Sequence, residues 1–173
     1  MLGSKPVLKR VTSVARAFIG FCVALAAVGF VQGTAYASGN NVKIVSADGS
    51  DFCMDASVDR AGRDGDPVYL YKCHGRENQR WTVTESGDGQ SALIGMGGYC
   101  LDVRGTHSKA DGTPVQLWKC HFGANQRFSL TPTGQLREQA SGKCLLVTAV
   151  KDRAPIVLDE CKNEPGQKWK LEK

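Results

Sequence analysis

Short alternations of apolar and polar residues run from residue 40 to residue 172 and predict β-strands. In the segment Val115-Gln116-Leu117-Trp118, every second residue is aliphatic. Because side chains alternate between the two faces of a strand, we expect Val115 and Leu117 to face a core, and Gln116 and Trp118 to face outward together. No stretch of this region has a convincing helical period. The pattern therefore predicts an all-β protein.

The alternations define twelve expected strands, joined by turns rich in Gly and Asp. Many short strands at regular spacing are typical of a closed β architecture. The expected strands cover residues 40–46, 52–56, 67–73, 80–84, 92–95, 99–103, 114–120, 127–131, 135–139, 143–147, 155–161 and 168–172.

The strands fall into three groups of four because the sequence repeats. Residues 64–81 read DGDPVYLYKCHGRENQRW, residues 111–128 read DGTPVQLWKCHFGANQRF, and residues 152–169 read DRAPIVLDECKNEPGQKW. Repetition at a fixed period indicates one supersecondary unit used several times. One unit cannot cover its own apolar face, whereas three units around an axis can share a core. We therefore place three repeats at about residues 42–84, 91–131 and 135–172.

The first 37 residues lack this pattern and are typical of a secretory signal peptide. A basic start is followed by an apolar run at residues 18–30, which is short for a bilayer span. Ala35-Tyr36-Ala37 then forms a cleavage site of small residues before Ser38. A membrane anchor is the alternative, but no basic stop-transfer segment follows. We predict a signal peptide at residues 1–37, one domain at residues 38–173, and a secreted, extracellular protein without membrane insertion.

Removing the signal peptide changes the charge of the chain. The peptide holds four of the 22 Lys and Arg residues and none of the 17 acidic ones, so the net charge falls from +5 to +1. A nearly neutral domain with dispersed charges is a poor candidate for binding nucleic acid or an anionic membrane.

Six cysteines remain once Cys22 leaves with the signal peptide, and an even number in an exported chain indicates disulfides. Fifteen connectivities are possible, but each repeat contains two cysteines, which favours one bond within each repeat. A metal site is the alternative, and the absence of a C-x-x-C pair argues against it. The predicted disulfides are Cys53–Cys73, Cys100–Cys120 and Cys144–Cys161.

The ends of the repeats carry a family resemblance. They close on Gln79-Arg80-Trp81, Gln126-Arg127-Phe128 and Gln167-Lys168-Trp169. Three Q-x-W-type endings, in register with three cysteine pairs, resemble the ricin-B-type lectins, whose carbohydrate-binding modules also occur attached to xylanases and other glycosidases. The resemblance covers about residues 42–171 and implies a β-trefoil of three four-stranded repeats. We expect the closing aromatic residues in the core and the glutamines bonded to backbone of the neighbouring loop.

Aromatic and acidic residues in the first two repeats suggest a sugar site. Tyr71 and Trp118 occupy matching outward positions, where a flat ring can stack on the apolar face of a sugar. Asp55 and Asp102 follow the first cysteine of their repeats by two residues, and carboxylates accept hydroxyl protons in strong, charge-assisted bonds. The predicted disulfides tie each aspartate near its aromatic strand. Ordinary strand composition and turn aspartates are the alternatives.

Asparagine and histidine residues complete the predicted pockets. Asn78 and Asn125 precede the closing motifs, and an amide can both donate and accept, although a loop asparagine can also bond its own backbone. His74 and His121 are equally well explained as pocket-edge donors and as loop residues. The resemblance implies sugar contacts at these positions, and Tyr69 departs from the glutamine usual at its place in the family. The predicted carbohydrate-binding residues are Asp55, Tyr69, Tyr71, His74 and Asn78 in the first pocket, and Asp102, Gln116, Trp118, His121 and Asn125 in the second.

The third repeat keeps the scaffold and loses these groups. Leu146 stands at the aspartate position, Asp159 at the aromatic position, Val157 at the Gln116 position and Gly166 at the asparagine position. We therefore expect no functional pocket in the third repeat.

These observations together predict a monomeric lectin for galactose- or xylose-type glycans, with no cofactor and no metal. An enzyme is not expected, because glycosidases need two nearby carboxylates and no local pair is present. A protein-binding trefoil, such as a protease inhibitor or a toxin-associated subunit, is the alternative, because one fold supports many functions.

Overall fold

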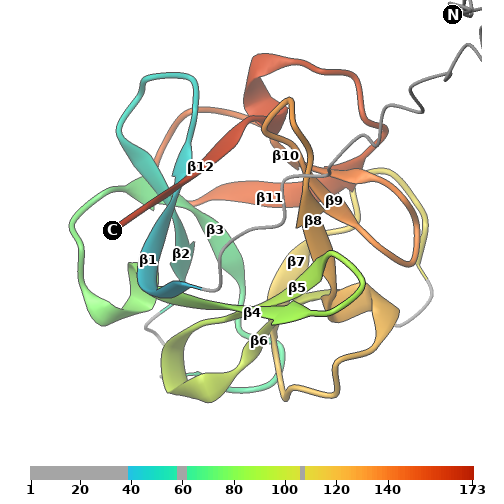
Figure 1. Cartoon of the computed structure of the whole chain (residues 1–173). Coiled ribbons are helices and arrows are strands. Elements are labelled where there is room, and N and C mark those ends of the chain that lie inside the picture. The colour runs from blue at the N-terminus through green and yellow to red at the C-terminus, as the bar shows by residue number, and fades with distance from the viewer. Residues whose placement is uncertain (1–38, 58–61, 106–107) are drawn as a thin grey trace, which may run out of the picture. The chain divides into compact units, whose positions relative to one another are not determined.

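The computed structural model describes residues 39–57, 62–105 and 108–173, and it is all-β (Figure 1). The predicted signal peptide, residues 1–37, lies outside the described residues. Within these described ranges, no helix is long and apolar enough to cross a membrane.

All twelve expected strands are present, and their ends differ from the predicted ends by at most two residues. Four single-turn 3-10 helices, which the sequence pattern did not reveal, are η1 (Glu77–Gln79), η2 (Met96–Gly98), η3 (Ala124–Gln126) and η4 (Pro165–Gln167). The strands are β1 (Gly39–Ser46), β2 (Phe52–Ala56), β3 (Val68–Lys72), β4 (Trp81–Ser86), β5 (Gln90–Ile94), β6 (Cys100–Val103), β7 (Val115–Trp118), β8 (Phe128–Leu130), β9 (Leu136–Glu138), β10 (Cys144–Val147), β11 (Ala154–Asp159) and β12 (Trp169–Glu172).

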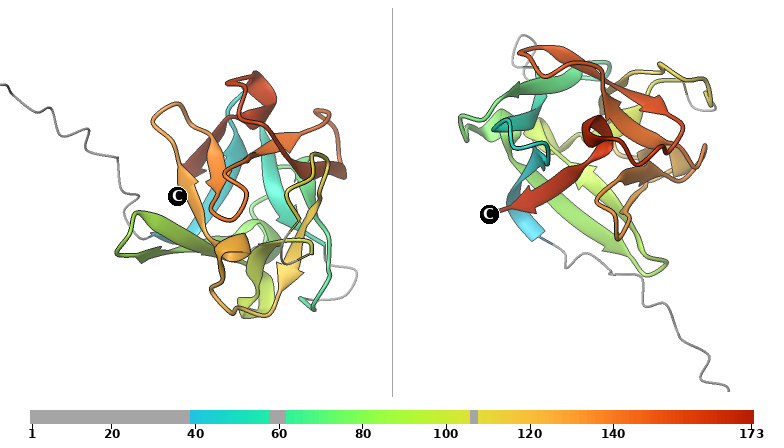
Figure 2. Two further views of the ribbon diagram at one scale, coloured as in Figure 1. Left: turned by 90° about the vertical axis from the view of Figure 1, so that its right-hand side faces the viewer. Right: turned by 90° about the horizontal axis from the view of Figure 1, so that it is seen from above.

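Six of the strands form a closed ring. β1 pairs with β12 and β4, β4 with β5, β5 with β8, and β8 with β9. A bridge between Gln135 and Lys168, next to β9 and β12, completes the ring. Both views in Figure 2 show β12 beside β1, where Lys43 and Glu172 form an ion pair of 3.1 Å. The ring leaves no free edge at these strands, which limits unwanted pairing with other chains.

The other six strands form three hairpins that meet one another across the three repeats, which we call the first, second and third lobes. The hairpins are β2–β3, β6–β7 and β10–β11. In each lobe a proline before or within the second strand of the hairpin pairs with the hairpin of another lobe. Proline has no N–H to donate, so it fits such sheet edges. The three cross-lobe pairs are Pro67 with Gln116, Pro114 with Val157, and Pro155 with Tyr69.

The core lies between the ring and the hairpins and draws on all three lobes. Trp81, Phe128 and Trp169, which close the repeats, are at most 2% exposed. The Nε1 groups of Trp81 and Trp169 donate to the carbonyl oxygens of Met54 and Leu145, each at 3.2 Å. The prediction that these aromatic residues are core residues is confirmed. Burying each such ring stabilises the fold by about 2–3 kcal/mol.

The three disulfides predicted from the repeat are also confirmed. Each joins the first strand of a hairpin to the residue after, or soon after, its second strand. Cα separations are 5.1 Å for Cys53–Cys73, 5.0 Å for Cys100–Cys120 and 5.1 Å for Cys144–Cys161. The bonds therefore fix the two strands of every hairpin at the same end.

Candidate functional site

Two hollows on the surface collect the residues that the sequence singled out. The first, of about 280 Å³, lies in the first lobe, and the second, of about 310 Å³, lies in the second lobe. The structure places all ten predicted residues in these hollows, five in each. The first is lined by Asp55, Tyr69, Tyr71, His74, Arg76, Asn78 and Arg153, and the second by Asp102, Arg104, Gly105, Gln116, Trp118, His121 and Asn125.

Strand register makes the positions in the three lobes directly comparable. Asp55 lies opposite Tyr69 in the β2–β3 hairpin, and Asp102 lies opposite Gln116 in the β6–β7 hairpin. In the β10–β11 hairpin the same place is taken by Leu146 opposite Val157. Differences between the lobes are therefore differences in side chains on one shared backbone arrangement.

A buried carboxylate forms the floor of the second pocket. Asp102 is 3% exposed, and its Oδ2 accepts hydrogen bonds from Asn125 Nδ2 at 2.8 Å and Gln126 Nε2 at 2.9 Å. Its Oδ1 accepts from Gln116 Nε2 at 3.0 Å. A charge is tolerated at such a position only when donors surround it. Three amides therefore hold this carboxylate in one orientation.

The first pocket repeats this arrangement with one change. Asp55 is 1% exposed, and it accepts from Asn78 Nδ2 and from Gln79 Nε2, each at 2.8 Å. Tyr69 replaces the glutamine opposite the carboxylate. Burial raises the pKa of the Asp55 carboxyl above its ordinary value of 3.8, although the amide donors and His74 oppose this shift.

The glutamines of the closing motifs connect the scaffold to the pockets. Gln79 Oε1 accepts from the backbone N–H groups of His74 at 2.8 Å and Gly75 at 3.1 Å. Gln126 Oε1 accepts in the same way from His121 and Phe122, at 2.9 and 3.0 Å. The expectation that these glutamines bond loop backbone is confirmed. Their Nε2 groups also hold the aspartates, a contact that the sequence did not reveal.

Both histidines lie at pocket edges with fixed rings. The Nδ1 atom of His74 accepts from the N–H of Arg76 at 3.3 Å, and that of His121 accepts from the N–H of Gly123 at 3.1 Å. Because Nδ1 accepts in both rings, Nε2 is the nitrogen that can donate. His74 Nε2 lies 3.3 Å from Asp55 Oδ2, and the corresponding distance in the second lobe is 3.6 Å. Among the described residues, no group of three or more His, Cys, Asp or Glu side chains could hold a metal ion.

The paired strand positions follow the expected alternation and line the pockets, but they differ in accessibility. Trp118 is 39% exposed and Tyr71 is half-buried. Tyr69 and Gln116, expected to face outward like their neighbours, are only 8% and 6% exposed. The reason is the cross-lobe pairing, which places a proline-containing segment of another lobe beside each of them. Only Tyr71 and Trp118, the second residue of each pair, have an accessible ring.

Neighbouring lobes also support the strands that carry the pocket aromatic residues. The N–H of Lys72, next to Tyr71, donates to Asp152 Oδ1 of the third lobe at 2.9 Å. The N–H of Lys119, next to Trp118, donates to Asp64 Oδ1 of the first lobe at 2.6 Å. Each aromatic strand is therefore held in place by a loop from a different repeat.

Three arginines of the pockets were missed by sequence reasoning. Arg153 comes from the third lobe, and its Cζ lies 5.7 Å from the centre of the Tyr69 ring in the first pocket. Arg76 lines the same pocket. Arg104 lines the second, and its Nε donates to Gln116 Oε1 at 3.1 Å. A usable signal existed for Arg153, because it replaces a glycine found in both other repeats.

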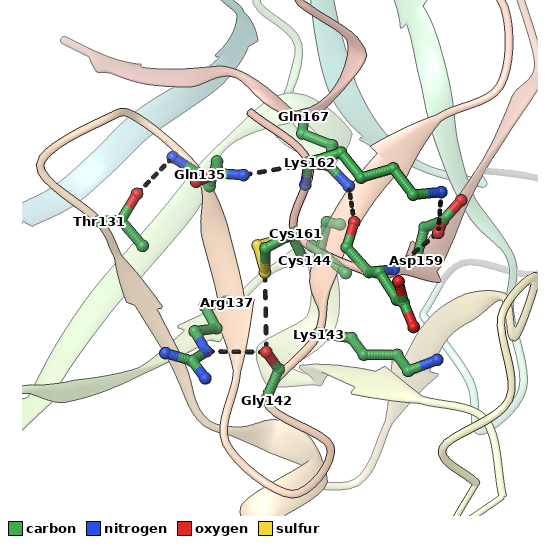
Figure 3. Close-up of a disulfide and its surroundings, with 12 residues drawn as sticks. Thr131, Gln135, Arg137, Gly142, Lys143, Cys144, Asp159, Cys161, Lys162 and Gln167 are labelled. Carbon is green, nitrogen blue, oxygen red and sulfur yellow. Dashed lines mark hydrogen bonds and ion pairs between the residues drawn. A yellow bond between two sulfur atoms is a disulfide. The ribbon is translucent and has the colours of Figure 1, made fainter. Parts of the chain in front are cut away.

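The third lobe fills the equivalent place with other contacts (Figure 3). A Cβ on Gly166 would lie 2.9 Å from the carbonyl oxygen of Val147 and 3.0 Å from Leu146 Cδ1, so the place of the asparagine in the other lobes is already filled, in part by Leu146. Asp159 and Lys162 face each other in Figure 3, with Nζ 3.0 Å from Oδ1. This ammonium lowers the pKa of the Asp159 carboxyl, and the carboxylate raises the pKa of Lys162.

The scaffold glutamine of the third lobe has kept its backbone bonds. Gln167 Oε1 accepts from the N–H of Lys162 at 2.8 Å, and its Nε2 donates to the carbonyl oxygen of Glu160 at 2.6 Å. Its further partner is Gln135, whose Nε2 donates to Gln167 Oε1 at 3.0 Å (Figure 3). The third lobe thus retains the support for a pocket without the carboxylate that the support holds elsewhere.

Sequence comparison gives two matching family models. The Ricin-type beta-trefoil lectin domain matches residues 90–173, and the Ricin-type beta-trefoil lectin domain-like model matches residues 30–118. The two matches together include all three repeats. Comparison with curated proteins finds no match.

Solved structures give matches to the same architecture. The designed threefold-symmetric protein ThreeFoil is 29% identical with a TM-score of 0.71, over 76% of this chain and 97% of ThreeFoil. An exo-β-1,3-galactanase of Clostridium thermocellum is 24% identical with a TM-score of 0.66, over 77% of this chain and 30% of the enzyme. A non-toxic type II RIP homologue of Momordica charantia, in complex with α-methyl-D-galactoside, is 21% identical with a TM-score of 0.61, over 78% and 49%. This chain therefore corresponds to only part of the last two proteins.

Proposed function

Because the chain belongs to the ricin-type β-trefoil lectin family, we propose that it binds glycans through its first two lobes and leaves them chemically unchanged. The observation that carries this proposal is the repeated site. A buried carboxylate, an asparagine, a histidine and an accessible aromatic ring come together twice on one backbone arrangement. The third lobe has the same backbone and other side chains.

Each group has a role suited to a sugar. The carboxylates of Asp55 and Asp102 accept hydroxyl protons, and the amides around them keep their lone pairs aligned. The Nδ2 groups of Asn78 and Asn125 already donate to those carboxylates, so their carbonyl oxygens remain for ligand hydroxyls. The exposed face of Trp118 suits the apolar C–H face of a pyranose ring. A ligand with a polar rim and one apolar face matches this set.

We expect galactose- or xylose-type glycans as ligands. The α-methyl-D-galactoside complex of the Momordica charantia protein and the galactanase make galactosides the first sugars to test. Shallow pockets of this kind bind single sugars weakly, with a free energy of about −4 kcal/mol at millimolar Kd. Two pockets on one rigid body would gain avidity on a polymer or a glycan array. We further propose that the protein acts as a secreted monomer and that the third lobe binds no sugar.

The carboxylates do not suggest catalysis. Glycoside hydrolysis uses two carboxyl groups about 5–10 Å apart on either side of one bond. Asp55 and Asp102 belong to different lobes, and each is held by its own set of amides. We therefore propose binding without turnover, and release of reducing sugar by the pure protein would contradict it.

Calorimetric titration with galactosides and xylo-oligosaccharides tests the proposal. Tyr71→Ala and Trp118→Ala should each remove one binding site, because each deletes the accessible ring of one pocket. The double variant should bind nothing, and Leu146→Ala in the third lobe is the matched control that should bind like the wild type. Glycan binding by the double variant at wild-type strength would refute the proposal. Capture of a protein that survives competition by free sugar would favour a protein-binding trefoil instead.

A further inference from the structure

An exposed aspartate of the first lobe holds the end of β7, the strand that carries the accessible ring of the second pocket. Asp64 does not line that pocket, but its Oδ1 accepts the N–H of Lys119 at 2.6 Å. Lys119 directly follows Trp118 in the sequence. Hydrogen bonds to an ionised carboxylate are stronger than bonds between neutral groups. The position of the residue after the ring is therefore fixed from outside its own lobe.

The peptide group of Lys119 is also connected to the floor of the pocket. Its carbonyl oxygen accepts from Gln126 Nε2 at 3.2 Å. The same Nε2 donates to Oδ2 of Asp102, the floor carboxylate, at 2.9 Å. A continuous chain of hydrogen bonds therefore leads from Asp64 to the carboxylate. A shift of Lys119 would disturb both the ring and the carboxylate.

The first pocket has the same chain of contacts. Asp152 of the third lobe accepts the N–H of Lys72 at 2.9 Å, and Lys72 directly follows Tyr71. The carbonyl oxygen of Lys72 accepts from Gln79 Nε2 at 3.0 Å, and this Nε2 donates to Asp55 Oδ2 at 2.8 Å. Asp152 does not line the first pocket. Both pockets thus have a support that begins in a neighbouring lobe and ends at the floor carboxylate.

The equivalent aspartate of the second lobe makes a different contact. Asp111 stands at the matching position in the repeat, but its carboxylate pairs with Lys143. The N–H of Glu160, which corresponds to that of Lys119, donates instead to Asp159 Oδ1 at 2.6 Å. Asp159 is the residue that stands in place of the aromatic ring. In the third lobe, the ring and its support from a neighbouring lobe are therefore absent together.

Backbone hydrogen bonds hold the neighbouring loop in the same place whether or not the aspartate contact is made. The N–H of Gly65 donates to the carbonyl oxygen of Leu117 at 2.8 Å, and the N–H of Gly112 donates to that of Leu158 at 2.8 Å. The loop of Asp111 is thus docked on the third lobe although the aspartate bonds elsewhere. Packing of the lobes does not require the side-chain contact, which occurs only beside the two pockets.

We propose that Asp64 and Asp152 are positioning residues for sugar binding in the neighbouring lobe. This inference rests on the proposed function. Each aspartate fixes the residue after the ring, and with it the ring and the glutamine that holds the floor carboxylate. Neither aspartate touches the sugar. Affinity at the second pocket therefore depends on Asp64 of the first lobe, and affinity at the first pocket depends on Asp152 of the third.

The test isolates the second pocket with Tyr71→Ala and measures its affinity for methyl galactoside and xylobiose by titration calorimetry. In this background, Asp64→Ala should weaken binding about five- to tenfold, because one hydrogen bond that orients the site is lost. Asp64→Asn keeps a carbonyl oxygen for the N–H of Lys119 and should restore most of the affinity. Asp111→Ala is the matched control from the third boundary between lobes and should leave the affinity unchanged.

Two further measurements separate positioning from a general loss of stability. Hydrogen exchange of the Lys119 amide, followed by NMR, should accelerate in Asp64→Ala and stay unchanged in Asp111→Ala. Asp152→Ala should leave the second pocket unchanged and weaken the first pocket when that pocket is isolated by Trp118→Ala. A merely structural role would lower the free energy of unfolding without changing the affinity measured well below the unfolding transition.

Three results would overturn the inference alone. These are unchanged sugar affinity in Asp64→Ala, an equal loss of affinity in Asp111→Ala, and an Asp64→Asn variant that recovers none of the affinity. The last result would assign the effect to charge and not to position. Absence of binding by the wild type to both probes would overturn the proposed function and the inference with it.

Discussion

The first two lobes and the third share a backbone and differ in what they offer to a ligand. All three have the hairpin, the disulfide and the glutamine that bonds loop backbone. Only in the first two lobes does that glutamine also donate a hydrogen bond to a buried carboxylate. In the third, Leu146 fills the space and Asp159 pairs with Lys162. The comparison separates residues that stabilise the fold from residues that build a site, and it does so within one chain.

Removing disulfides should produce the largest effects on stability and should test that separation. Each bond closes a loop of 17 to 20 residues, so its loss should cost roughly 3 kcal/mol of unfolding free energy. We expect similar losses from Cys100→Ala with Cys120→Ala and from Cys144→Ala with Cys161→Ala, measured by denaturant unfolding. Sugar binding measured well below the unfolding transition should weaken only in the second-lobe variant. Equal loss of binding from the third-lobe pair would show that scaffold and site are not separable.

Replacing an aspartate should produce the next largest effect. Asp102→Ala leaves three amide donors without their acceptor, so unfolding free energy should fall by about 1–3 kcal/mol. Affinity at the second pocket should fall about 10- to 100-fold, since a charge-assisted bond to a hydroxyl is lost. The matched control is Asp159→Ala in the third lobe, which should leave glycan affinity unchanged. A first pocket isolated by Trp118→Ala should be unaffected by either change, and titration calorimetry with circular dichroism measures both effects.

The pH dependence of the first pocket should be the smallest effect. Burial raises the pKa of Asp55 above 3.8, and the ionised form is the one that accepts sugar hydroxyls. Affinity in the Trp118→Ala variant should therefore decline on acidification while the pH is still above 3.8. The effect on stability has the opposite sign. Because the pKa of Asp55 is raised in the folded state, this carboxyl stabilises the fold fully at a pH below its unfolded-state pKa. That stabilisation is lost as the pH rises through the folded-state pKa.

Asp55→Asn is the control for both pH effects. An amide does not titrate, so the acid-dependent loss of affinity and the matching stability change should both disappear. Titrations from about pH 4 to pH 7 cover the relevant range for a carboxyl group. An unchanged pH profile in Asp55→Asn would assign the dependence to another group.

The sequence predicted the strands and the pockets because both depend on local pattern. Alternation places Val115 and Leu117 in the core, and the repeat aligns Asp55 with Asp102 without any knowledge of space. The cysteine pairs followed from the same repeat. Every step of this kind compares residues within one repeat or at one fixed offset.

The remaining features depend on contacts between lobes. Tyr69 and Gln116 are buried because segments of other lobes pair beside them, which alternation alone does not show. Arg153 lies about 80 residues from Tyr69 in the sequence and reaches it only through the threefold arrangement. The glutamine-to-aspartate bonds need the single 3-10 turns, which have no clear sequence period.

The loop at Asp152 and Arg153 makes the third lobe part of the first pocket's support. Asp152 anchors the strand of Tyr71, Arg153 covers Tyr69, and β12 pairs with β1. A protein shortened to the two lobes that hold pockets would thus lose one wall of the first. The third repeat can therefore lack the buried carboxylate and the accessible aromatic ring of the other two and still be required, since its neighbour is built partly from it.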